Sequence, residues 1–365
     1  MPTSVQPDPV QDDSDSGLGG EDVQLFPELK IRGSPKHLAW PIKRFNACQK
    51  NAVRALGLGD MLDFQVEGIP KSMCRWLISN FDPTNMCLSL ENGLVLPVTE
   101  EDVHYTLGLP QGSVVITKRK KDDVSDTLKE WRSKFDKEKH DITPAMIATK
   151  VRSLLEGDVW FKRHFAVLVV SVLGGTMTNG YANQLIFHHF EDVDGIKNLN
   201  WCKFILESLV ERHAQWVHNP DKQFSGPIVF LLLHYVDRVV HSDRVVPRLV
   251  PSLRGWSSRH LKARQLSEIR AGGFGRGIIK GHIVVATDHQ VCFPISVSHC
   301  TRSGLLVCAC AFLLHILIVF PWGSCPFRFL CRRTLLLVGE THMLTPLSQR
   351  YSGLCALMLL CVRAY

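Results

Sequence analysis

The sequence predicts a mainly α-helical globular domain that contains one β-hairpin, between a disordered acidic N-terminus and an apolar, cysteine-rich C-terminal tail. Apolar residues recur at spacings of three and four through most of residues 25–277, which is the pattern of amphipathic helices. One segment instead alternates about Asn92-Gly93, which indicates a hairpin. With 365 residues, 45% of them hydrophobic, the chain can bury a substantial core.

Residues 1–24 are expected to form a disordered acidic tail. They are rich in Pro, Asp, Ser and Gly, and they lack both a basic start and an apolar stretch. Such a segment cannot bury enough apolar surface to offset the entropy of ordering it, and it is neither a signal peptide nor a transit peptide.

The first helices are expected between residues 42 and 81. Segment 42–58 carries apolar residues at mixed spacings of three and four, and Gly57 and Gly59 favour its end. Segment 69–81 has Pro70 in its first turn and a single apolar stripe.

A hairpin and a capped helix come next. In residues 86–98 apolar residues alternate on both sides of Asn92-Gly93, the dipeptide that most readily adopts the positive φ angles of a tight turn. Thr99 is a helix cap, and the acids at 100–102 lie at the positive end of the helix dipole. This helix is expected to end at Gly108.

The second half of the domain is also expected to be helical. Residues 161–173 are apolar on nearly all faces, which predicts a central core helix that is too short to span a bilayer. The other expected helices are one after Thr143-Pro144, an amphipathic one at 201–217, a buried one at 228–233 with a polar exit at 234–238, and an exposed one at 256–270. The total is about eight helices.

A charged insertion at 117–141 interrupts this pattern. It contains an expected exposed helix around Leu128, Trp131 and Phe135. Four consecutive cations precede that helix: Lys118, Arg119, Lys120 and Lys121. They fit a nuclear-import patch or a phosphate contact as well as they fit a solvated loop face.

Several strings of residues carry a resemblance to a known family. They are Trp76–Asp82, Val98–Val103 leading to Leu107–Gly112, Asn200–Phe204, and Gly226–Leu231 with Tyr235–Arg238. Together they resemble the plant mobile domain, often labelled aminotransferase-like, over roughly residues 35–277. The resemblance implies a lineage shared by plant transposable elements and host genes, in which a similar region precedes a cysteine peptidase of ubiquitin-like modifiers. It implies no set of active-site residues.

No catalytic, cofactor-binding or metal-ligating residue is assigned, and no cofactor is expected. A transaminase needs a Schiff-base lysine, a phosphate cradle and an acid against the pyridine nitrogen, and no segment assembles that set. Cys74 and Cys202 lie on expected helices beside Trp and apolar residues, which is the environment of inert packed thiols.

Two further motifs are weak signals. The glycine-rich residues 273–277 follow a helix and lack the Lys-Ser/Thr of a phosphate loop, which favours a flexible linker. His188-His189 lie near three acids, Glu191, Asp192 and Asp194. Adjacent histidines are expected to point to different faces, which favours surface histidines over a metal cluster.

The tail at 278–365 differs in composition from the domain. From Gly281 to Tyr365 there is no lysine, there are two acids, and there are eight of the twelve cysteines of the chain. Residues 303–320 hold roughly the number of apolar residues that a membrane helix needs. The cysteines form no paired CxxC. This composition favours translated non-coding sequence over a membrane anchor or a metal site.

The charge distribution and the resemblance together give the expected function. Six arginines and two acids give the last 85 residues +4 of the net charge of +7, so the first 280 residues carry +3, too little to indicate a nucleic-acid surface. We expect a non-enzymatic interaction module of transposon origin, located in the nucleus, that binds protein or nucleic-acid partners. The alternatives are a single-pass membrane protein anchored by 303–320 and a non-catalytic N-terminal arm of a ubiquitin-like-modifier cysteine peptidase.

Overall fold

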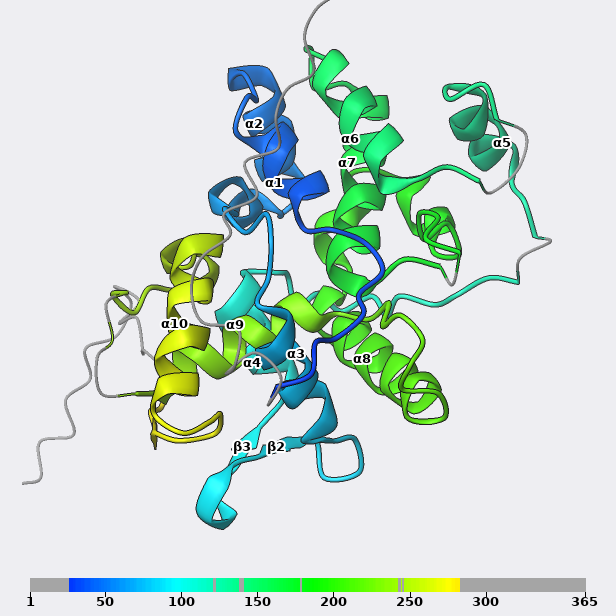
Figure 1. Ribbon diagram of the computed structural model, residues 1–365. Coiled ribbons are helices and arrows are strands. Elements are labelled where there is room, and N and C mark those ends of the chain that lie inside the picture. The colour runs from blue at the N-terminus through cyan, green and yellow to red at the C-terminus, as the bar shows by residue number, and fades with distance from the viewer. Residues whose placement is uncertain are drawn as a thin grey trace, which may run out of the picture. The chain divides into compact units, whose positions relative to one another are not determined.

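The part of the chain that the computed structural model describes contains ten α-helices and two small sheets (Figure 1). The described residues are 26–282 except 121–122, 138–140, 178, 242–243 and 245. All of them belong to one unit, Met1–Ala286, and a second unit comprises Thr287–Tyr365. The expected acidic tail, the apolar segment 303–320 and the tail cysteines therefore lie outside the described residues. Within the described part, no helix has both the length and the apolar character needed to cross a membrane.

The single helix expected over 42–58 is wrong, because the chain forms two helices in this region. α1 (Lys36–Ile42) and α2 (Ala47–Ala55) are separated by a turn that ends at Asn46. The Asn46 side chain accepts a hydrogen bond from the Gln49 N–H, and the Gln49 side chain accepts one from the Asn46 N–H. This capping box starts α2, and it cannot be predicted from the spacing of the apolar residues.

The expected hairpin is present within a three-stranded antiparallel sheet. After α3 (Lys71–Ser79), β1 (Phe81–Asp82) pairs with β2 (Cys87–Ser89), and β2 pairs with β3 (Val95–Pro97). The connection between β2 and β3 is a 3-10 turn at Glu91–Gly93 and not the tight two-residue turn that Asn92-Gly93 predicts.

The cap and the end of the next helix are confirmed. α4 (Glu100–Leu107) begins at Thr99, whose hydroxyl accepts the Asp102 N–H while the Asp102 carboxylate accepts the Thr99 N–H. Gly108 ends the helix with a φ of 66°, a conformation that favours glycine.

The helix in the charged insertion is not exposed as expected. α5 (Asp126–Ser133) buries Trp131 completely, and the indole ring contacts the rings of His164 and Phe187. Three apolar side chains in a charged segment therefore form an anchor that holds the insertion to the core.

The central core helix at 161–173 is confirmed. α7 (Val159–Val169) follows α6 (Pro144–Ser153) and continues as a π-helical turn, Val170–Gly174. α8 has the expected bounds, Trp201–Val217. α6 packs on α1 and α7, and α8 packs on α4.

The helix expected at 228–233 is longer and more deeply buried than predicted. α9 (Ile228–Arg238) packs against α3 and α4, and its residues from Ile228 to Asp237 are all buried. The prediction that residues 234–238 form a polar end of this helix outside the core is therefore wrong, since His234 and Asp237 are buried.

The last described helix and the two strands of the second sheet lie beside α9. α10 (Ser258–Arg270) buries Leu261, Arg264 and Glu268 and is not the exposed helix that was expected. β4 (Val239–Val240) pairs antiparallel with β5 (Ile278–Ile279), which lies beyond residue 277.

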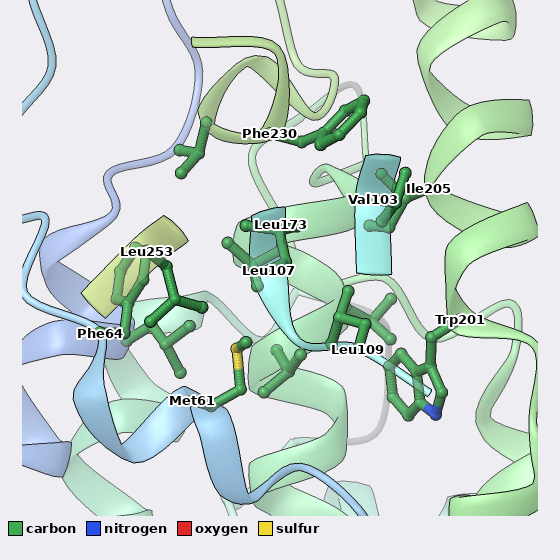
Figure 2. Packing of buried hydrophobic residues seen from close by; sticks show 14 of the residues in the cluster. Met61, Phe64, Val103, Leu107, Leu109, Leu173, Trp201, Ile205, Phe230 and Leu253 are labelled. Carbon is green, nitrogen blue, oxygen red and sulfur yellow. The ribbon is translucent and has the colours of Figure 1, made fainter. Parts of the chain in front are cut away.

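The buried apolar side chains form one cluster to which most elements contribute. Figure 2 shows part of it, with Val103 and Leu107 from α4, Phe230 from α9 and Leu173 from the π-helical turn. Met61 and Phe64 enter from the segment after α2. This packing fixes the positions of the helix ends from which the polar clusters project.

Candidate functional site

The basic loop that the sequence singles out lies against the segment around residues 184–189. The Thr117 N–H donates to Nε2 of His189 at 2.9 Å, and the Arg119 N–H donates to the Leu185 carbonyl at 2.9 Å. Lys118, Arg119 and Lys120 are exposed, and Lys121 lies outside the described residues. Backbone hydrogen bonds therefore hold the loop at Thr117 and Arg119, and the cations at 118–120 face solvent.

A small pocket lies between this loop, α5 and the 184–188 segment. Its lining includes Arg119, Lys120 and Asp123 from the loop, Arg132 from α5, and Gln184 and His188. The cavity measures about 20 Å³, somewhat more than the space that one water molecule needs.

Positive charge in the lining exceeds negative charge. Arg119 lies 3.5 Å from the Asp123 carboxylate, and Lys118, beside the pocket, pairs with Glu211 of α8. Lys120 forms no ion pair with a described residue. Arg132 donates from Nε to the Gln184 side-chain oxygen at 2.9 Å, and within the described part its guanidinium has no carboxylate partner. Three cations therefore line the pocket with one acid, Asp123.

Burial also affects the ionisable groups of the pocket. Desolvation lowers the pKa of the half-buried Arg132. Burial, the neighbouring His189 and Arg119 lower the pKa of His188 to about 4, so its ring is neutral at pH 7. The buried Nδ1 of His188 has no hydrogen-bond partner within the described structure.

The two histidines do not point to different faces, so that part of the sequence interpretation is wrong. They lie in a 3-10 turn, Phe187–Phe190, and their ring centroids are 4.0 Å apart. Both Nε2 atoms face the Thr117 hydroxyl, at 3.4 and 3.3 Å. Among the described residues, no group of three or more His, Cys, Asp and Glu side chains is placed to hold a metal ion.

The thiols of the described part include the two that were expected to be packed and inert. Cys74 and Cys202 are fully buried, and the Cys202 thiol donates to the Leu109 carbonyl at 3.3 Å. Burial raises the pKa of Cys74 well above its ordinary value, and burial with the nearby Glu100 raises the pKa of Cys202 to about 12. A nucleophilic thiol has a lowered pKa, so both groups have the opposite property.

A second polar cluster lies at the end of α9, within the Tyr235–Arg238 string. Arg238 and His282 both contact Oδ1 of Asp102, at 2.6 and 2.7 Å. Next to them, Asp237 accepts hydrogen bonds from Arg244 at 2.7 Å and from Arg248 at 3.1 Å. These carboxylates join α4, α9 and the 278–282 segment, so the cluster has a structural role.

The glycine-rich segment after α10 is packed, and its interpretation as a flexible linker is wrong. Phe274 is buried between the rings of Phe26 and Trp76, at centroid distances of 5.1 and 6.0 Å. The Gly275 N–H donates to the Tyr235 hydroxyl at 2.8 Å, and that hydroxyl donates to Glu268 at 2.5 Å. The glycines allow a close approach of the backbone to aromatic rings.

The sequence indicates only the loop side of the pocket. Arg132, Gln184 and His188 come from segments that are distant in sequence, and the burial of Trp131 brings Arg132 to the pocket. The only available signal was the apolar spacing of Leu128 and Trp131, which predicts that α5 has a buried face and hence that Arg132 lies beside it.

Comparison with protein families matches more than half of the chain. The model of a family described as a domain of unknown function, DUF8566, matches residues 31–232. No curated protein and no solved structure matches the chain.

Proposed function

The chain belongs to the DUF8566 family, a domain of unknown function, and from this starting point we propose that it is a non-enzymatic interaction module that acts in the nucleus through its basic loop. The observation that carries the proposal is the exposure of Lys118, Arg119 and Lys120 on a loop that backbone hydrogen bonds hold at Thr117 and Arg119. A fixed basic surface can bind an import receptor or an acidic partner, because little entropy is lost when it binds.

The clusters at the end of α9 and beside α10 support the non-enzymatic part of the proposal. In each of them an acid is engaged by arginine: Asp102 by Arg238, Asp237 by Arg244, and Glu268 by Arg264. A general base needs a carboxylate that is accessible to a substrate. These three carboxylates instead hold helix ends and strands together.

We also propose that the module has a transposon origin. Its support is the resemblance of residues 35–277 to the plant mobile domain. In a protein of transposon origin, the module would bind another protein or nucleic acid, and the basic loop would be the surface that contacts it.

Nuclear accumulation of the full-length chain tests the proposal. We expect the tagged protein to accumulate in nuclei, and we expect a variant with Lys118, Arg119, Lys120 and Lys121 changed to Ala to lose most of that accumulation. The matched control changes four other exposed cations to Ala: Lys36, Arg44, Lys50 and Arg54. It removes the same charge and should accumulate as the wild type does.

Three results would contradict the proposal. One is cytosolic retention of the unmodified protein, another is equal loss of accumulation in both variants, and the third is a wild-type protein that detergent alone releases from membranes. The last result would favour an anchor at residues 303–320.

A further inference from the structure

The pocket beside the basic loop has the properties of an anion site. Arg119, Lys120 and Arg132 line it together with one acid, Asp123, so positive charge remains uncompensated. Arg132 is half-buried and its guanidinium has no carboxylate partner among the described residues, although burying an unpaired charge is unfavourable. A bound anion would supply the missing partner.

A second observation points to the same kind of ligand. His188 lines the pocket, and the buried Nδ1 atom of its ring makes no hydrogen bond within the described structure. A buried polar atom without a partner is rare in native proteins and costs free energy. The neutral ring can place its proton on Nδ1 and donate to an anion oxygen.

The donor set fits a phosphate group. An arginine presents a planar fork of N–H donors that matches two phosphate oxygens, and a lysine adds a point charge. Two arginines and one lysine, opposed by one acid, leave a charge of about +2, which matches a phosphate monoester dianion better than a single carboxylate.

The surroundings of the pocket favour a single phosphate group over a nucleic-acid strand. Several acids stand near it: Asp126 and Glu130 on α5, Glu191 beyond His188, and Glu211 paired with Lys118. A strand carries a charge on every nucleotide and binds along a track of cations, which these carboxylates would repel. The cavity of about 20 Å³ holds about one oxygen-sized atom, so one terminal oxygen of the group enters it and the rest of the group lies at its mouth.

We propose that this pocket binds the phosphate monoester of a phosphorylated side chain on a protein partner. This inference rests on the proposed function and narrows its partner to a phosphoprotein. Arg132 and Arg119 bind the phosphate oxygens, Lys120 adds charge at the mouth, and His188 donates from Nδ1. Asp123 orients Arg119 through their ion pair.

Calorimetric titration of the full-length chain with phenyl phosphate tests the site. We expect saturable binding that Arg132→Lys and Lys120→Gln each weaken about tenfold, the effect of losing one charge-assisted hydrogen bond. Lys120 is exposed, and its side chain forms no hydrogen bond or ion pair with a described residue, so its variant remains informative if Arg132→Lys is unstable. The matched control is Lys129→Gln, which removes one cation from the exposed side of α5, where Lys129 pairs with Asp126, and should bind as the wild type does.

Nuclear magnetic resonance of His188 provides a readout that a purely structural role would not change. Burial, His189 and Arg119 lower its pKa to about 4, while Glu191 and Asp123 act in the opposite direction. A dianion against the ring favours the protonated form, so saturation with phenyl phosphate should raise the pKa of His188. An unchanged titration curve at saturating ligand would contradict the assignment of His188.

Further results distinguish failure of the phosphate site from failure of the proposed nuclear function. Absence of phenyl phosphate binding, or equal weakening by Lys129→Gln, overturns the phosphate site and leaves the nuclear-accumulation result standing. A phosphoserine peptide should bind more tightly than its unphosphorylated form and more tightly than a single-stranded 12-nucleotide DNA. Preference for the DNA would overturn the phosphoprotein partner in favour of nucleic acid.

Discussion

Arg238 donates a hydrogen bond of 2.6 Å from Nη1 to Oδ1 of Asp102, and this ion pair joins the end of α9 to the first turn of α4. The side chain of Asp102 is 3% exposed and that of Arg238 is 11% exposed. The same carboxylate also accepts the Thr99 N–H as part of the helix cap. One side chain therefore serves both the start of a helix and the contact between two helices.

Replacement of Asp102 should destabilise the fold strongly. In Asp102→Asn the buried guanidinium of Arg238 loses its charged partner, and we expect the free energy of unfolding to fall by about 3 kcal/mol. Urea denaturation of the full-length chain measures this change. The control, Glu101→Gln, removes an exposed acid from the same helical turn and should cost about 0.5 kcal/mol. Similar losses in the two variants would contradict the role given to the ion pair.

Two buried histidines should make the domain sensitive to acid. Burial lowers the pKa of His164 and of His234 to about 4, so both are neutral in the native state at pH 7. The unfolded chain takes up these protons near pH 6.5, so it binds more protons than the native state between pH 6.5 and 4, and stability falls as pH decreases through this window. The upper limit is about 3 kcal/mol for each histidine.

Unfolding at several pH values between 7 and 5 checks this dependence. His164→Phe retains an aromatic ring beside Trp131 and Phe135 and should make the loss of stability shallower. His218→Gln, at an exposed position, should leave the slope unchanged. A wild-type stability that is constant over this range would contradict the buried neutral state of the two rings.

The glycine-rich loop should be intolerant of a side chain at Gly275. An added Cβ would lie 2.7 Å from Cζ2 of Trp76, and the φ of 88° is itself unfavourable for alanine. We expect Gly275→Ala to cost about 3 kcal/mol, of which the φ angle contributes about 1 kcal/mol. Gly93→Ala isolates that smaller term, because Gly93 has a φ of 72° and no atom within 4 Å of the added Cβ. Thermal unfolding of the two variants should differ accordingly, and equal shifts would mean that Trp76 moves aside freely.

Thiol labelling should separate the cysteines of the described part. Cys48 is exposed, whereas Cys74, Cys87 and Cys202 are buried. Brief treatment of the native chain with iodoacetamide, followed by peptide mass spectrometry, should modify Cys48 before the other three, because alkylation requires an accessible thiolate. Rapid labelling of Cys74 or Cys202 would reopen the peptidase interpretation.

The elements that the sequence predicts correctly are those whose signal is local. Thr99, Gly108 and the bounds of α8 were predicted because caps and amphipathic periodicity act over a few residues. The division of α1 from α2 was missed because apolar spacing is the same on both sides of the Asn46 cap.

Burial of polar residues could not be read from local pattern. Asp237 and Glu268 look like surface acids in the sequence. Arginines seven and eleven residues after Asp237, and one helical turn before Glu268, pair with them and allow them to be buried. The candidate site is only partly predictable for the same reason. Lys118–Lys120 are consecutive cations in the sequence, whereas Arg132 and His188 line the pocket only because of tertiary packing.

The edge-on contact between Phe26 and Phe274, with ring centroids 5.1 Å apart, brings the first described residue beside a segment that lies eight residues before the last described one. A folded unit whose ends are adjacent can be placed within a loop of another protein without stretching the host backbone. We therefore expect the helices of the domain to be arranged in the same way whether it is inserted into a host protein or fused to an end of one.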